Sequence, residues 1–133
     1  MSRENVEAVR RYLARAVEAR DEVWGIFDED VEWDLGGIGR PDFPDSSRGP
    51  DAVRDFFRRW VGAFEDWGFD IEEVIDHDEA VAVHIHQWGR GKGSGATVAE
   101  RFWQIWFLRD GKAVRVTHRR SRDEALEAVG LRE

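Results

Sequence analysis

Apolar residues recur every three or four positions in two long stretches of the chain, which is the spacing of one helix face. Residues 3–20 show this spacing first, with Ser2 in the position of an N-terminal cap. Residues 50–66 show it most clearly and begin at Pro50, which the first turn of a helix tolerates. Residues 21–30 are expected to form a short helix between the two. The apolar positions of the long stretches are Val6, Val9, Leu13, Ala16, Val17, Val53, Phe56, Phe57, Trp60, Val61 and Phe64.

The remaining ordered parts alternate between apolar and polar residues in short runs, which predicts strands. An Asp-Gly pair at positions 110–111 is a typical hairpin turn between two of these runs. Ser121 and Glu124 form the capping box of a short final helix that ends near Gly130. The expected strands cover residues 31–35, 69–76, 80–88, 97–108 and 113–120.

Residues 36–50 contain four glycines and all three prolines of the chain. A connection of this length without periodicity is uncommon inside a compact domain, and such segments often act as lids. We therefore expect this segment to close over a pocket.

The order of the expected elements, helices first and then an antiparallel series of strands, indicates an α+β fold. The helices are expected to pack on one face of a strongly curved, mainly antiparallel sheet. The run RFWQIWFL, residues 101–108, is apolar on both faces of its strand. A sheet covered by helices on one side needs a cover on the other side. A second copy of the chain is the simplest cover, so a homodimer is expected.

Length, composition and charge narrow the classes of protein further. The chain has 133 residues, the length of a single domain over residues 1–133. It has no cysteine, which excludes disulfides, thiolate metal sites and cysteine nucleophiles. Its formal net charge of −8 argues against nucleic acid as the main partner. It shows neither a membrane-spanning apolar run nor a signal-peptide pattern, so no membrane partner is expected and a cytoplasmic location is predicted.

Seven tryptophans and eight phenylalanines accompany a single tyrosine. So many large apolar rings in a small domain indicate a roomy aromatic interior, a subunit interface, or both. A small apolar molecule is the ligand that such an interior would hold. The rings expected to contact it are Trp33, Trp60, Phe102 and Trp106.

Two polar residues interrupt the apolar faces of the last two strands. Gln104 shares a face with Phe102 and Trp106, because side chains two residues apart in a strand point the same way. His118 shares a face with Val116 for the same reason. His118 is a candidate acid or base near neutral pH, and Gln104 a candidate substrate contact. The alternative for Gln104 is a core amide with satisfied hydrogen bonds.

Arg120 continues the face of His118 at the end of the last strand. A guanidinium there is a candidate partner for a substrate carboxylate, for Asp34 or for Glu100. The alternative is ordinary solvation at a strand end.

His84 and His86 share one face of an expected strand, a spacing that metal sites use. A metal needs a further ligand, and no acid follows until Glu100. We therefore expect the pair on the outer or dimer face, with no metal. The glycine-rich run 89–95 begins a match to a dinucleotide-binding pattern, but a strand follows it instead of a helix. It is interpreted as a hairpin, and no cofactor is expected.

Three segments of the chain carry a resemblance to a known family. They are VRRYLARAVEARDEVWGIFDEDVEWD, RGPDAVRDFFRRW and RFWQIWFLRDGKAVRVTHRRSRDEALEAVGL. Together they resemble the nuclear transport factor 2-like superfamily, in particular its SnoaL-like and ketosteroid isomerase-like branch. The resemblance covers nearly the whole chain and implies a cone-shaped, cystatin-like α+β roll. Isomerases, polyketide cyclases, dehydratases, epoxide hydrolases and pure binding proteins share this fold, so the fold alone does not select a function.

The same resemblance implies roles for individual residues. Asp34 in VEWD matches the general base of the isomerases, and Tyr12 in RRYL matches their oxyanion-hole tyrosine. Gln104, or else Trp103, stands where those enzymes place a second acid, which argues against steroid isomerisation itself. One hypothesis is a cofactor-independent isomerase, cyclase or dehydratase, with Asp34 as base and His118 as proton shuttle. The other is a non-catalytic ligand-binding or dimerisation domain, in which Asp34 faces solvent or caps the loop.

Overall fold

The computed structural model describes residues 2–16, 25–38 and 44–131 of the chain. Within these ranges no helix is long and apolar enough to cross a membrane. The elements in these ranges are α1 (Ser2–Ala16), β1 (Phe27–Asp34), β2 (Ser46–Arg48), α2 (Pro50–Gly62), β3 (Phe64–His77), β4 (Ala80–Gly91), β5 (Thr97–Arg109), β6 (Lys112–Arg119) and α3 (Arg122–Val129).

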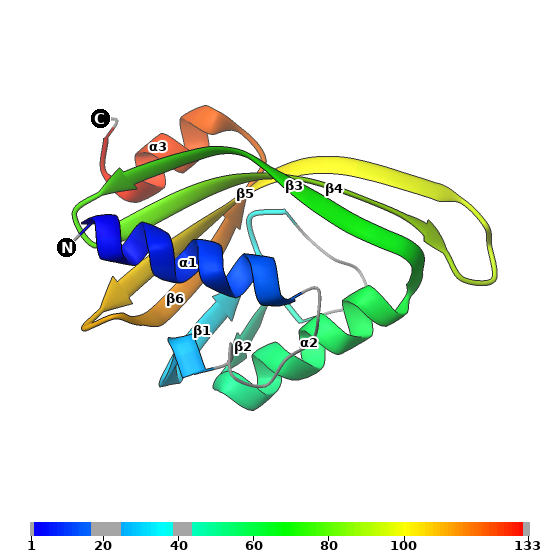
Figure 1. The fold of residues 1–133 in the computed structure, drawn as a ribbon, viewed down its shortest axis with the longest axis horizontal. Helices are drawn as coiled ribbons and strands as arrows, with labels where there is room; N and C mark the ends of the chain where they lie inside the picture. Colours follow the sequence, from blue (N-terminus) through cyan, green and yellow to red (C-terminus); the bar gives the residue numbers. More distant parts are fainter. Residues whose placement is uncertain (1, 17–24, 39–43, 132–133) are drawn as a thin grey trace.

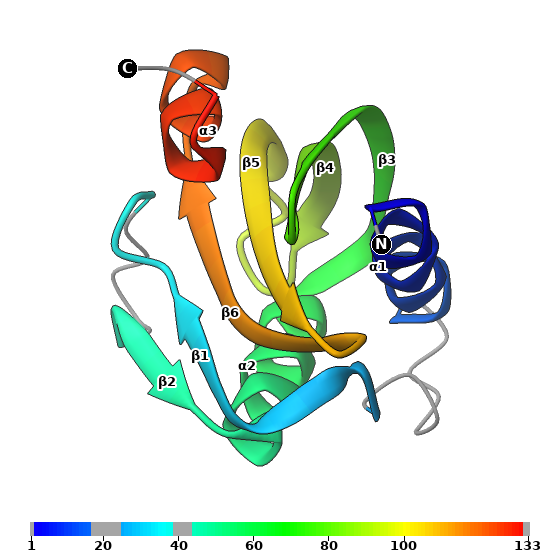
Figure 2. The same ribbon diagram turned by 90° about the vertical axis from the view of Figure 1, so that its left-hand side faces the viewer.

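The strands form one curved, open sheet in the order β2-β1-β6-β5-β4-β3. Four neighbouring pairs are antiparallel, whereas β1 and β6 run parallel, so the sheet is mixed. Figures 1 and 2 show α1 and α2 on the inner side of the curve and α3 on the outer side. The predicted α+β class, with helices on a curved and mainly antiparallel sheet, is confirmed.

The alternation of side chains along β5 divides the strand between two apolar cores. Phe102 and Trp106 point into the inner core, which α1 also enters. Trp103 and Ile105 point the other way, into an outer core completed by Ala125 and its neighbours on α3. The helix α3 therefore supplies cover on the face for which a second copy of the chain was expected. The homodimer stays a prediction.

The prediction of a short helix over residues 21–30 is wrong for its last part, which forms a strand. Phe27 begins β1, where it pairs with Ala113 of β6 and enters the inner core. Pairing with a distant strand therefore decides the backbone conformation here, against the local pattern. Residues 17–24 lie outside the described residues, and with them the rest of that helix and the end of the helix expected at 3–20.

The second long helix is also shorter than its apolar stripe indicates. It ends at Gly62, and Phe64 pairs with Gly91 as the first residue of β3. The connection expected over residues 36–50 contains β2, which pairs with β1. Residues 39–43 lie outside the described residues, so a lid stays a prediction.

The last helix follows the sequence prediction closely. The Ser121 hydroxyl accepts a hydrogen bond from the backbone N–H of Glu124, and the Glu124 side chain accepts one from the backbone N–H of Ser121. Gly130 ends the helix with φ at 87°, a left-handed conformation that glycine adopts without strain. The capping box determines where α3 begins, and Ala125 and Val129 pack the helix against the outer face of the sheet.

Candidate functional site

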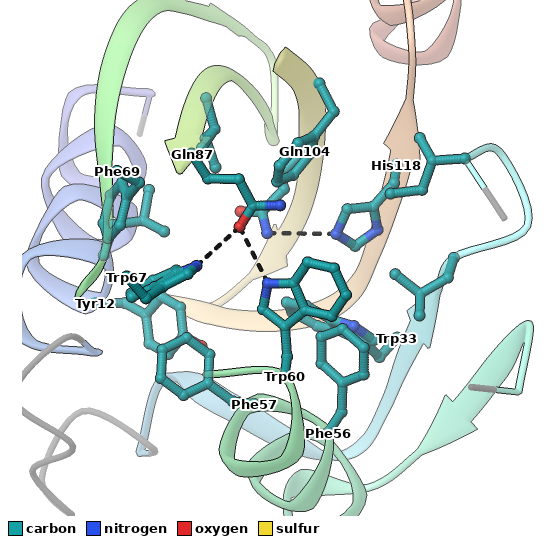
Figure 3. A pocket seen from close by; sticks show the side chains of 15 residues that line it. Tyr12, Trp33, Phe56, Phe57, Trp60, Trp67, Phe69, Gln87, Gln104 and His118 are labelled. Atoms are coloured by element: carbon teal, nitrogen blue, oxygen red, sulfur yellow. Dashed lines mark hydrogen bonds between the residues drawn. The ribbon is translucent and has the colours of Figure 1, made fainter. Parts of the chain in front are cut away.

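A cavity of about 60 Å³ lies between α1, α2 and the inner face of the sheet (Figure 3). It exceeds the roughly 10–15 Å³ that one water needs and falls short of the ~300 Å³ of a typical small-molecule site. Its walls are mainly aromatic and aliphatic. The lining residues are Tyr12, Leu13, Trp33, Leu35, Ile38, Phe56, Phe57, Trp60, Trp67, Phe69, Ile85, Gln87, Phe102, Gln104 and His118.

Three of the four rings predicted to contact a ligand reach the cavity wall: Trp33, Trp60 and Phe102. The fourth, Trp106, shares their face but is completely buried and is not part of the lining. Its indole N–H donates to Gln104, and a ligand contact at Trp106 stays a prediction. Contact of the other three with a ligand stays a prediction.

A chain of hydrogen bonds fixes the protonation of His118. Its Nδ1 lies 2.8 Å from the backbone oxygen of Asp34, which can only accept, so Nδ1 carries the proton. The indole N–H of Trp106 donates to Oε1 of Gln104 at 3.1 Å, which turns the amide nitrogen towards His118. That nitrogen lies 3.3 Å from Nε2 of His118. In this arrangement Nε2 of His118 carries no proton, and its lone pair accepts the hydrogen bond from Gln104 at the cavity wall.

A second buried amide, Gln87 on β4, joins two tryptophans of the cavity wall. Its Oε1 accepts hydrogen bonds from the indole N–H of Trp60 at 3.0 Å and of Trp67 at 3.1 Å. Its Nε2 donates to Glu100 on β5 at 2.6 Å. Figure 3 shows the two indoles meeting at the one amide oxygen. The sequence analysis missed Gln87, although its place two residues after Ile85 in an alternating strand indicates this face.

Tyr12 projects from α1 to the cavity and is only 3% exposed. Its ring contacts Phe27 and Trp106, with centroid distances of 5.2 and 5.1 Å. Burial raises the pKa of the Tyr12 phenol far above its usual value, so the hydroxyl keeps its proton at physiological pH. It can therefore donate a hydrogen bond, as the resemblance implies, but cannot serve as a base.

Asp34 does not reach the cavity, because its side chain lies on the face of β1 opposite to Trp33. Its carboxylate accepts from the backbone N–H of Gly36 at 2.8 Å. It also accepts from Arg115 at 3.1 Å and from Thr117 at 3.2 Å. Partial burial raises the Asp34 pKa, but these bonds and the charge of Arg115 outweigh it and hold the pKa below its usual value. The carboxylate faces away from the cavity and its lowered pKa makes it a weaker proton acceptor, so the general-base role of Asp34 stays a prediction.

Arg120 also lies outside the cavity lining. The strand β6 ends one residue before it, so the alternation that predicted its direction no longer applies. Its guanidinium donates to the backbone oxygen of Ile38, a residue that lines the cavity. The expected pairing with Asp34 is made by Arg115 instead. Arg120 thus holds a segment of the cavity wall.

The histidine pair of β4 lies away from the cavity. His84 stacks on Trp103 of the outer core, with ring centroids 4.6 Å apart. Its Nδ1 is 3.8 Å from Glu72, and His86 contacts Trp88. Within the described parts of the chain, histidines and carboxylates form no group of three or more that could hold a metal ion.

Solved structures of similar fold cover nearly the whole chain. TerC, co-crystallised with polyporic acid, is 22% identical with a TM-score of 0.75, over 95% of this chain and 97% of that chain. Bal32a, from a soil-derived mobile gene cassette, is 18% identical with a TM-score of 0.80, over 96% of this chain and 97% of that chain. A protein of ketosteroid isomerase-like fold from Catenulispora acidiphila, in complex with trimethylamine, is 17% identical with a TM-score of 0.72. The match covers 94% of this chain and 93% of that chain. At these identities the likeness supports the fold alone.

No curated protein matches the chain in sequence. The SnoaL-like domain, in contrast, matches residues 4–116, from α1 to the middle of β6. This agrees with the nuclear transport factor 2-like fold and with the resemblance found in the sequence. The chain therefore belongs to the SnoaL-like domain family.

Proposed function

We propose that this protein binds a small, largely apolar molecule in the cavity between α1, α2 and the sheet. The observation that carries the proposal is the composition of the cavity wall. Aromatic and aliphatic side chains form nearly all of it, and the imidazole of His118 and the amides of Gln87 and Gln104 are the main polar groups. A few polar groups in an apolar wall are typical of sites that orient a small ligand. The complexes of TerC with polyporic acid and of the Catenulispora protein with trimethylamine support this proposal by analogy of fold.

The test measures binding of phenol and 2-naphthol, two flat probes of different size, by ¹⁹F NMR of protein labelled with 5-fluorotryptophan. Wild-type protein should bind phenol in the high micromolar to millimolar range, typical of a few kcal/mol of apolar burial. Ile85→Phe enlarges a side chain of the cavity wall and should abolish this binding. Ile75→Phe is the matched control, because Ile75 packs against the outer core. Saturable binding that survives Ile85→Phe, or its absence in wild type, would overturn the proposal.

A second candidate function is proton transfer on a bound carbonyl compound, as the predicted isomerase or cyclase activity requires. The observation that favours it is the neutral His118 ring, with Nδ1 donating to a backbone oxygen and Nε2 unprotonated at the cavity. Such a nitrogen can accept a proton from carbon once the Gln104 amide N–H leaves it and donates instead to the developing oxyanion, to which the hydroxyl of Tyr12 can also donate. His118 then takes the role that the resemblance implied for Asp34.

Exchange of the α-protons of cyclohexanone in D₂O, followed by NMR, tests this second function. Wild-type protein should accelerate the exchange above the rate in buffer, and His118→Asn should remove the acceleration. His84→Asn, a matched change on the outer face, should keep it. Loss in Asp34→Asn with full activity in His118→Asn would return the base role to Asp34. Equal rates with and without protein would leave a binding protein without this activity.

A further inference from the structure

One amide ties together four elements around the cavity. Gln87 on β4 accepts from Trp60 at the end of α2 and from Trp67 near the start of β3, and it donates to Glu100 on β5. We propose that Gln87 is a positioning residue that holds Trp60 and Trp67 as a closed wall, and thereby sets the size of the molecule that the cavity admits. This inference rests on the proposed binding function.

The orientation of the Gln87 amide follows from the charge beside it. A carboxylate can only accept hydrogen bonds, so Glu100 requires the amide nitrogen of Gln87 on its side, at 2.6 Å. The amide oxygen must then face the opposite way, towards the cavity wall. Its two lone pairs match the two indole N–H groups that meet there, at 3.0 and 3.1 Å. The arrangement is complete, because neither indole donor is left unsatisfied and the oxygen has no capacity left for a ligand.

The wall that Gln87 holds is the more exposed side of the cavity. Trp60 and Trp67 are both half-buried, whereas Tyr12 and Trp33 on the other side are each 3% exposed. The latter two belong to the inner core, whereas Trp60 and Trp67 contact partly buried rings at its edge, Trp60 on Phe56 and Trp67 on Phe57 and Phe69. Without the hydrogen bonds to Gln87, Trp60 and Trp67 keep these ring contacts but lose the bonds that link their indoles to β4.

The backbone under Trp67 is also irregular. The ladder between β3 and β4 shifts register between Glu65 and Gly68, so Trp67 sits in a bulge. Asp66, just before it, has φ at 55°, in the left-handed region that residues other than glycine adopt rarely. Trp60 lies two residues before the end of α2, on the other side of the same corner. Both tryptophans thus flank the junction between α2 and β3, and the Gln87 oxygen links them across it.

The size of the cavity gives this tie a consequence for binding. With the wall closed, the space is about 60 Å³, well below the ~300 Å³ of a typical small-molecule site. A molecule larger than a single ring needs part of the lining to move. The two indoles belong to the half-buried side of the lining and share one acceptor, so their displacement is the route to a larger site.

The first experiment needs no ligand and compares wild type with Gln87→Met, which keeps the length of the side chain and removes the acceptor. In protein labelled with 5-fluorotryptophan, the ¹⁹F resonances of Trp60 and Trp67 should shift, broaden and gain solvent isotope effect. Each net hydrogen bond shifts a local equilibrium by about fivefold, so losing both should raise the open population by about 5- to 25-fold. Ile75→Met, a change towards the outer core that leaves the bonds of Gln87 in place, is the control and should resemble wild type. Unchanged resonances of both tryptophans in Gln87→Met would overturn the proposal.

The second experiment compares the affinities of the two probes. Gln87→Met should improve binding of 2-naphthol relative to phenol by about fivefold or more, because the open wall admits the second ring. An unchanged ratio of dissociation constants would overturn the role in size selection, even if the resonances move. If Gln87→Met does not fold, the double variant Trp60→Phe with Trp67→Phe removes the same bonds from the donor side and should change the ratio in the same direction. If neither probe binds wild type, the proposed function fails. The ¹⁹F resonances of Trp60 and Trp67 still decide whether the hydrogen bonds to Gln87 hold the two indoles in place.

Discussion

Replacing Asp34 by Asn separates a structural role of this carboxylate from a catalytic one. The carboxylate accepts three hydrogen bonds, from Gly36, Arg115 and Thr117, over 2.8 to 3.2 Å. Hydrogen bonds to a charged group contribute about 1.5–3 kcal/mol each and neutral ones about 0.5–1.5 kcal/mol. An Asn side chain also turns an amide N–H₂ group towards donors, so at least one of the three bonds is lost.

The expected loss of stability follows from these bonds and from their exposure to solvent. The side chains of Asp34 and Arg115 are 21% and 43% exposed, so solvent screens part of the attraction. We expect Asp34→Asn to lower the free energy of unfolding by about 1–2 kcal/mol at pH 7. Urea denaturation followed by circular dichroism measures this difference. Asp30→Asn, an exposed change on the same strand, controls for the loss of one negative charge.

The stability difference between wild type and Asp34→Asn should shrink as the pH falls. The pKa of Asp34 is lower in the folded protein than in the unfolded chain, where it is about 3.9. Its contribution is therefore complete above the unfolded pKa and is lost as pH falls through the folded pKa. Wild type and Asp34→Asn should differ most at pH 6–7 and converge towards pH 2. A variant as stable as wild type at pH 7, or a difference that grows in acid, would refute the structural role.

Three further changes test other parts of the structure by urea denaturation. Gly37→Ala should lower the free energy of unfolding by about 2–4 kcal/mol. The new Cβ would lie 1.9 Å from the backbone oxygen of His118, so the loop or β6 must move. A variant as stable as wild type would contradict this packing. Ser121→Ala should cost about 1 kcal/mol through loss of the helix cap, and no change would mean that α3 does not depend on its capping box. Trp106→Phe should cost about 1–3 kcal/mol, since it removes buried volume and the donor to Gln104. A neutral result there would show that the amide is oriented by other groups.

Much of the fold could be predicted because it depends on local periodicity. The alternation in residues 97–108 places Phe102 and Gln104 on the inner face and Trp103 on the outer one, as the structure has them. The capping box at Ser121 acts within four residues, so its sequence pattern is sufficient. The short helix expected in residues 21–30 fails at its end for the opposite reason, since pairing with β6 determines the conformation of Phe27.

The candidate site was predicted in part, and the division has a physical cause. Sequence alone determined which residues share a strand face, which brought Trp33, Phe102, Gln104 and His118 to one cavity wall. It could not determine partners, because a hydrogen bond depends on positions that only the folded chain brings within about 3 Å.

Only the tertiary structure placed Arg115 against Asp34, 81 residues apart, where it lowers the pKa of the expected base. It also brought Trp60 and Trp67 to the amide of Gln87, across 27 and 20 residues of chain. Periodicity along a strand determines the direction of a side chain, whereas the group that it meets, and with it the pKa and the chemistry, is decided by the packing of distant segments.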